Sequence, residues 1–190
     1  MYKIFIFILF FSSVSSLFAS DTLEKLIVDA KNGDGIAQSL LADRYYEGKG
    51  VQQSYSKAVK WFKKAAMQGD SLSQFTLGEM YYEGKGVTKN YSEAAKWYLM
   101  AAERGDDIAQ IFIGEMYYKG LGVKQNYSEA AKWFMKLAKR GNDSAQFFLA
   151  VMYMDAQGVP RDYKKGMQWL KRSAEKGNPS ARKLLKAMNE

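Results

Sequence analysis

The 190-residue sequence contains no cysteine, no histidine and only two prolines. Without cysteine the chain cannot form disulfides or thiolate metal sites, and without histidine it lacks the commonest metal ligand and general base. These absences exclude the zinc sites and the nucleophilic catalysis that depend on Cys or His. We therefore expect no cofactor and no metal site, and enzyme classes that need Cys or His are excluded.

Long apolar segments are also scarce. A membrane-spanning helix needs about 20 predominantly apolar residues, whereas the N-terminal run, 4–11, has eight and is followed by serines. Lys3 gives this run a positive start, and four serines follow it before Ala19 and Ser20, which is typical of a secretion signal. We predict that residues 1–20 are a cleaved signal peptide, that no integral membrane segment remains, and that the mature protein is periplasmic or secreted. An uncleaved amphipathic anchor is the alternative interpretation.

The sequence does contain a repeat with a period of 36 residues. The eight residues that begin at Asn90 return letter for letter at Asn126, and looser copies begin at Ser54 and Asp162. All four tryptophans therefore fall on one register, which we interpret as a core column: Trp61, Trp97, Trp133 and Trp169. A fixed period between 20 and 50 residues is typical of stacked repeats, none of which can bury its apolar face alone.

Each repeat predicts two helices. A glycine followed by Asp or Asn closes one helix and caps the next, and a Gly-x-Gly-Val loop separates the two helices within a repeat. In the second helices, Glu93 and Glu129 stand where they would complete a capping box. In the fourth repeat Ala156 replaces the first loop glycine, which predicts a distorted turn. The small residues beside large ones in the first helices predict close helix–helix approach.

The predicted fold class is all-α, an α/α solenoid of helix-turn-helix repeats. We assign residues 21–33 to an N-terminal capping helix and residues 178–190 to a C-terminal one. Between them we assign four repeats: 34–69, 70–105, 106–141 and 142–177. Such a chain needs no oligomer to fold, so we expect a monomer.

The recurring pattern is Ala-x-x-x-Leu-Gly-x-x-Tyr, Gly-x-Gly-Val, Asn-Tyr-x-x-Ala-x-x-Trp, Ala-x-x-Gly. It is complete through residues 73–141, with Ser73 for the first Ala, and the match extends from about Asp34 to Ala187. This pattern resembles the Sel-one-like repeat (SLR) family, a relative of the tetratricopeptide repeats. The resemblance implies a right-handed superhelix used as an adaptor, common in bacterial envelope and secreted proteins, and it implies no catalytic residue.

By similarity to tetratricopeptide repeats, the first helix of each repeat lines a concave groove that binds a partner protein or peptide. Net charges of −2, −3, −2 and −2 on the first-helix segments, against +5, +2, +4 and +4 on the rest of the repeats, favour a basic or apolar partner. The implied partner-binding residues are Asp43, Tyr46, Glu47, Phe75, Glu79, Tyr82, Glu83, Ile111, Glu115 and Tyr118. The alternative interpretation is that the tyrosines of these columns serve the fold.

Two other functions stay open at this point. Glu79 and Glu115 could act as paired carboxylates in a hydrolase of peptidoglycan or another glycan, because adjacent first helices lie about 10 Å apart. The lysines of the second helices are most simply a solvated face, although they could also meet anionic lipid. We do not expect nucleic-acid binding, because the lysines are scattered and export separates the protein from nucleic acid.

Overall fold

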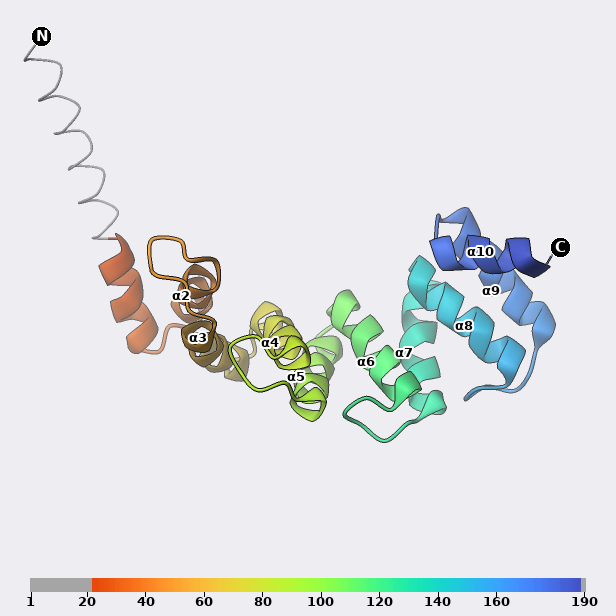
Figure 1. Ribbon diagram of the computed structural model, residues 1–190, viewed down its shortest axis with the longest axis horizontal. Coiled ribbons are helices and arrows are strands. Elements are labelled where there is room, and N and C mark those ends of the chain that lie inside the picture. The colour runs from red at the N-terminus through yellow and green to blue at the C-terminus, as the bar shows by residue number, and fades with distance from the viewer. Residues whose placement is uncertain (1–21, 189–190) are drawn as a thin grey trace, which may run out of the picture. The chain divides into compact units, whose positions relative to one another are not determined.

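A computed structural model describes residues 22–188 of the protein (Figure 1). The predicted signal peptide, 1–20, lies outside these residues. Within them every regular element is a helix, so the prediction of an all-α repeat fold is confirmed. None of the helices between residues 22 and 188 is long and apolar enough to cross a membrane.

A helix over residues 22–31 is followed by eight helices of 13 residues and a final helix of 10. They are α2 (Gly35–Glu47), α3 (Tyr55–Met67), α4 (Ser71–Glu83), α5 (Tyr91–Glu103), α6 (Asp107–Lys119), α7 (Tyr127–Lys139), α8 (Asp143–Asp155), α9 (Tyr163–Glu175) and α10 (Pro179–Met188). The chain divides into two compact units between Thr88 and Lys89. In the first unit α3 packs against α2 and α4, and in the second unit α5 to α10 pack successively on one another.

The first helices of the repeats, α2, α4, α6 and α8, share their caps. The N-cap side chain accepts a hydrogen bond of 2.7–2.9 Å from the backbone N–H three residues on, and the N-caps are Asp34, Asp70, Asp106 and Asn142. Each C-cap residue is left-handed. Ala156 has φ 58° and ψ 34°, close to the 77° and 23° of Gly48, so the predicted distortion of its turn was wrong. The turn is kept because alanine accepts this conformation at a cost of about 1–2 kcal/mol.

The second helices, α3, α5, α7 and α9, have their N-caps where the copies of the sequence repeat begin, at Ser54, Asn90, Asn126 and Asp162. Half of each predicted capping box is confirmed, because the backbone N–H groups of Glu93 and Glu129 donate to the Oδ1 atoms of Asn90 and Asn126 at 3.0 and 3.1 Å. The glutamate side chains do not complete the other half but have other partners. The carboxylates of Glu93 and Glu129 form ion pairs with Lys96 and Lys132 at 2.5 and 2.6 Å. In α7 the backbone N–H of Asn126, which a capping box would bind, already donates to the Tyr117 carbonyl oxygen at 2.9 Å. The glutamate therefore has no open donor to reach back to.

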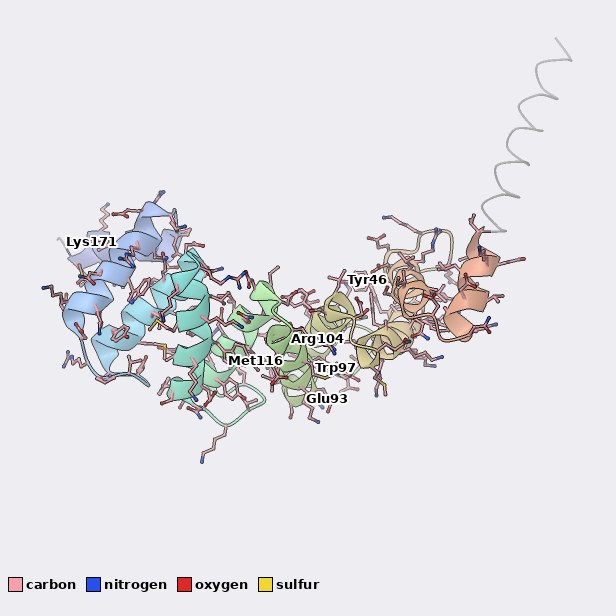
Figure 2. The ribbon with its side chains drawn as sticks, turned by 180° about the vertical axis from the view of Figure 1, so that it is seen from behind. Tyr46, Glu93, Trp97, Arg104, Met116 and Lys171 are labelled. Atoms are coloured by element: carbon pink, nitrogen blue, oxygen red, sulfur yellow. The ribbon has the colours of Figure 1, made fainter. Side chains whose placement is uncertain are left out.

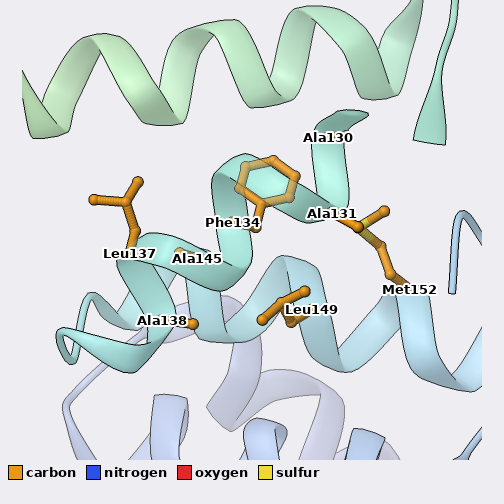
Figure 3. Packing of buried hydrophobic residues seen from close by; sticks show 8 residues of the cluster. All are labelled: Ala130, Ala131, Phe134, Leu137, Ala138, Ala145, Leu149 and Met152. Carbon is orange, nitrogen blue, oxygen red and sulfur yellow. The ribbon is translucent and has the colours of Figure 1, made fainter. Parts of the chain in front are cut away.

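The core of the second unit centres on Phe134 of α7 (Figure 3). Its ring lies against Gly114 of α6, where an added Cβ would come within 2.7 Å of the ring. It also stacks on Phe148 of α8, with ring centroids 4.5 Å apart. Leu137, Leu149 and several alanines complete the cluster. A small residue beside a large one therefore does allow close helix packing, as the sequence predicts.

The tryptophan register is less buried than a core column should be. Trp97 is buried, whereas Trp61, Trp133 and Trp169 are half-buried. The fully buried position is the next one, at most 2% exposed in every repeat: Phe62, Tyr98, Phe134 and Leu170. One residue turns a helix by about 100°, which places the tryptophans at the edge of the buried face. There, Lys64 and Arg172 lie 4.4 and 5.0 Å from the ring centroids of Trp61 and Trp169.

Buried glutamines, which sequence reasoning missed, tie successive helices together. Each is at most 4% exposed and donates through Nε2 to the alanine carbonyl oxygen eight residues earlier, at 2.9–3.1 Å: Gln38, Gln74, Gln110 and Gln146. The acceptor lies at the end of the preceding helix, where carbonyl groups lack a full set of helical partners. The bond therefore fixes the turn between one repeat and the next. A glutamine at every thirty-sixth position was the available signal in the sequence.

The loop within a repeat approaches the preceding repeat at its second glycine. Gly86 has φ +75°, and an added Cβ would lie 2.5 Å from the backbone carbonyl carbon of Tyr55 at the start of α3. Gly122 makes the same approach to Tyr91 in the second unit. Gly50 shares the backbone conformation, but among residues 22–188 it has no backbone neighbour of this kind within 4 Å. The second glycine therefore serves both the turn and the stacking of repeats.

Candidate functional site

The predicted partner-binding residues of the first unit lie on α2 and α4, which both pack against α3. They are Asp43, Tyr46 and Glu47 on α2, and Phe75, Glu79, Tyr82 and Glu83 on α4. Glu47 and Glu83, in the last turns of these helices, are exposed, and the other five are half-buried. We refer to these seven residues as the acidic face of the first unit.

Asp43 carries a charge that its surroundings stabilise poorly. Partial burial is the largest cause that raises its pKa, and the negative charges of Glu47 and Asp70 raise it further. Lys49 opposes this increase but is itself ion-paired with Glu47 at 2.5 Å. Among residues 22–188 no side chain forms an ion pair with Asp43.

Glu79, in the next repeat, also carries a charge that its surroundings stabilise poorly. Burial raises its pKa first and the charge of Glu83 raises it second, while Lys85 lowers it. In the described part of the chain, neither Glu79 nor Glu83 has an ion-pair partner within 4 Å. The acidic face therefore carries half-buried carboxylates that lack an ion-pair partner, and a cation from outside would stabilise them.

Tyr46 has a packing role as well as a place on this face (Figure 2). Its hydroxyl oxygen accepts a 2.8 Å hydrogen bond from Lys85 Nζ, which comes from the loop of the next repeat. Lys85 also lies 4.3 and 4.5 Å from the ring centroids of Tyr46 and Tyr55, and the hydrogen bond to Tyr46 is the largest cause that raises the pKa of Lys85. The ring meets Tyr55 and Phe62 edge-on. For Tyr46, these contacts agree with the interpretation that the tyrosine column serves the fold.

The three predicted residues of the second unit lie on α6 and are differently placed. Ile111 is half-buried and packs against the core cluster around Phe134. Glu115 is neutralised by Lys119, one turn on, at 2.5 Å. The Tyr118 hydroxyl donates a 2.6 Å hydrogen bond to Gln157 Oε1, and burial is the main cause that raises the pKa of Tyr118. The acidic character found on α2 and α4 is thus absent from the exposed side of α6 among these residues.

A hollow of about 410 Å³ lies where α8 meets α10 in the fourth repeat. Its apolar wall is built from Val151, Met154, Leu184 and Met188. Val151 occupies the column that holds Asp43, Glu79 and Glu115 in the earlier repeats. The sequence signal was this change from acid to valine. Asp155, Arg161 and Tyr163 complete the lining, so the hollow presents charged groups of both signs beside its apolar wall.

The hydrolase interpretation depends on Glu79 and Glu115 acting as a pair. Glu79 and Glu115 belong to different units, and the carboxylate of Glu115 is held by Lys119. Within residues 22–188 no group of three or more Asp and Glu side chains is placed to hold a metal ion. The geometry therefore provides binding groups on α2 and α4 and gives no support to a pair of carboxylates acting across a glycosidic bond.

Comparison with known proteins identifies the repeat. The profile of the Sel1 repeat, the Sel-one-like repeat named above, matches four times, at residues 35–70, 71–106, 107–142 and 143–178. No curated protein matches the sequence significantly.

Two solved structures show the same fold. A protective antigen present in uropathogenic Escherichia coli strains, which displays the SLR fold, is 37% identical with a TM-score of 0.77 over 87% of this chain. A Sel1 repeat protein from Oxalobacter formigenes is 38% identical with a TM-score of 0.73 over 84% of this chain. The chain spans 36% of the first protein and 65% of the second.

Proteins of this family are in general non-enzymatic scaffolds that bind protein partners. The four consecutive matches cover most of the sequence, and they coincide with the helix pairs, caps and glycine loops described above. The chain therefore belongs to the Sel1 repeat family.

Proposed function

We propose that the protein is an exported, non-enzymatic scaffold that binds a partner polypeptide on the acidic face of its first unit. The observation that carries this proposal is the pair of half-buried carboxylates, Asp43 and Glu79, that have raised pKa values and no ion pair within the described chain. A folded protein that keeps two such charges uncompensated is less stable for it. A binding role explains why they are kept.

The chemistry of the face specifies the partner. A lysine or arginine side chain that docks beside Asp43 or Glu79 supplies the missing counter-charge, and Arg can bind a carboxylate through two parallel hydrogen bonds. Phe75, one turn before Glu79 on α4, adds half-buried aromatic surface. We infer that the partner segment carries basic side chains and at least one apolar side chain.

Affinity capture with matched variants tests this function. The mature protein, an Asp43→Asn/Glu79→Gln variant and a Glu93→Gln/Glu129→Gln control are immobilised and exposed to cell-envelope extract. The control removes two acids from second helices and leaves the acidic face intact. We expect a polypeptide that the wild type and the control retain and that the variant loses. Equal retention by all three proteins would place the partner elsewhere.

Export is tested separately. We expect the protein made in its own cells to be found in the envelope or the medium, with an N-terminus that begins close to residue 20 or 21. Edman sequencing or mass spectrometry of the purified protein measures this directly. A full-length chain that keeps Met1 and stays in the cytoplasm would refute export without touching the binding proposal.

A further inference from the structure

The solvent side of α7 contains a hollow of about 770 Å³, which lies entirely within the second unit. This volume falls in the range of about 300–1,000 Å³ that is typical of ligand sites. The hollow extends from α7 to the loop that precedes α9, and its lining residues are Ser128, Ala131, Lys132, Met135, Lys136, Lys139, Arg140, Gly158 and Val159.

The floor of the hollow is apolar and its rim is basic. Met135 and Val159 form the floor, and both also pack partly against the core cluster around Phe134. Two of the four cations on the rim have acidic partners: Lys132 pairs with Glu129 at 2.6 Å and Arg140 pairs with Asp107 at 2.5 Å.

The other two rim cations, Lys136 and Lys139, have no ion-pair partner in the described part of the chain. Both side chains are exposed to solvent. The hollow therefore has an excess of positive charge above an apolar surface.

This combination is specific to the third repeat. The position of Met135 is lysine in the first and fourth repeats, Lys63 and Lys171, and leucine in the second. The position of Lys139 is methionine in the first repeat and glutamate in the second and fourth. An apolar floor under four cations is therefore not a consequence of the repeat pattern, because no other repeat has both parts.

The spacing of the cations indicates the form of the ligand. The two unpaired cations, Lys136 and Lys139, are three residues apart, which corresponds to about 4.5 Å along a helix, and Lys132 and Arg140 extend the row of cations over eight residues, about 12 Å. A single phosphate group would reach only one or two of these cations. A second helix with carboxylates at three- and four-residue intervals presents negative charges over the same length, with apolar side chains on the adjoining stripe.

We propose that the hollow on α7 is a docking site for an acidic amphipathic helix of a partner polypeptide. The carboxylates of that helix pair with Lys136 and Lys139, and its apolar side chains lie over Met135 and Val159. This site takes a ligand of opposite charge to that of the acidic face on α2 and α4. The two proposals use different residues and can fail independently.

The test uses the mature protein and fluorescence anisotropy with a labelled synthetic probe. The probe is a 16-residue helix with Glu at three- and four-residue intervals and Leu on the adjoining stripe, and a scrambled peptide of the same composition is its control. We expect the helical probe to bind at least tenfold more tightly than the scrambled peptide. Equal affinities would overturn the proposal.

Variants locate the binding. Lys136→Gln/Lys139→Gln should weaken the probe about tenfold, the effect of losing two surface ion pairs. The matched change on α3, Lys60→Gln/Lys63→Gln, removes the same charge from a helix of the first unit and should leave affinity within about twofold. Loss in both variants to the same extent would show general charge attraction and would refute a site on α7.

A third variant separates shape from charge. Met135→Lys installs the residue that the first and fourth repeats already hold, so the fold accepts it, and it adds a positive charge while it removes the apolar floor. Docking in the hollow predicts weaker binding, whereas attraction by charge alone predicts stronger binding.

Vesicles of phosphatidylglycerol and phosphatidylcholine test lipid as the alternative ligand. Vesicle binding that depends on Lys136 and Lys139, with no binding of the probe, would assign the hollow to lipid and overturn the proposal.

Discussion

Replacing Gly86 with alanine should destabilise the first unit much more than the same change at Gly50. Both glycines are left-handed, with φ +75° and +72°, so both variants place alanine in a conformation that costs about 1–2 kcal/mol. Only Gly86 adds a steric conflict, because its new Cβ would lie 2.5 Å from the Tyr55 carbonyl carbon, while at Gly50 the neighbour is the flexible end of Arg44 at 3.2 Å.

The backbone of Tyr55 cannot move without shifting the start of α3, and overpacking of this kind costs about 1–3 kcal/mol. Alanine also restricts the unfolded chain, which offsets part of the left-handed strain, so the expected loss is about 0.5–1 kcal/mol for Gly50→Ala and about 1.5–4 kcal/mol for Gly86→Ala. Urea unfolding followed by circular dichroism at 222 nm measures both, and equal m-values ensure that the same transition is compared. Equal losses of stability in the two variants would refute the argument that Gly86 is required by the approach between repeats.

Three further predictions concern stability. Ala156→Gly should raise the free energy of unfolding by about 0.5–1 kcal/mol, because glycine relieves the left-handed strain but gains freedom when unfolded; thermal unfolding detects this. Gln38→Leu should lower the free energy of unfolding by about 1 kcal/mol more than Gln110→Leu, and urea unfolding measures both. The reason is that Gln38 Oε1 accepts a 2.8 Å hydrogen bond from Gln68 Nε2, whereas Gln110 Oε1 accepts none in the described chain. The raised pKa values of Asp43 and Glu79 mean that the folded state binds their protons more tightly, so their contribution to stability is greatest below the ordinary values of 3.8 and 4.5 and is lost as the pH rises through the raised values. An Asp43→Asn/Glu79→Gln variant should therefore gain stability relative to wild type as the pH increases from about 4 to 7, and a constant difference over that range would contradict the assigned pKa directions.

The fold could be predicted because the same helix caps and glycine loops recur in each repeat. Four copies of the same cap and glycine positions locate the helix ends, and the caps at Ser54 and Asn126 act as the sequence indicates. The errors came from competition between local partners. Glu129 pairs forward with Lys132 because Tyr117 already occupies the N–H that a capping box would use. Trp61, Trp133 and Trp169 are only half-buried, while Trp97 is buried, because the fully buried column lies one residue further on. Apolar spacing does not resolve a rotation of one residue.

The candidate site was harder to predict because its character depends on contacts between repeats. The sequence places Glu79 and Glu115 in the same column, yet Lys119 neutralises only the second. Lys85, which donates a hydrogen bond to the Tyr46 hydroxyl, lies 39 residues further along the chain. The hollow on α7 arises from the combined replacements at Met135 and Lys139, which individually look like ordinary variation on a solvated helix.

Site-specific photo-cross-linking tests the central claim, that the acidic face of the first unit binds a partner polypeptide. A photo-reactive amino acid replaces Glu47, an exposed residue of that face, and in a second variant it replaces Lys60, an exposed residue on α3. After illumination in the protein's own cells, we predict that the variant with the photo-reactive residue at position 47 is cross-linked to a polypeptide and that the variant at position 60 is not. The cross-link should be lost when Asp43→Asn/Glu79→Gln is added to the position 47 variant. The same cross-links from both positions, or cross-links from position 60 alone, would contradict the account.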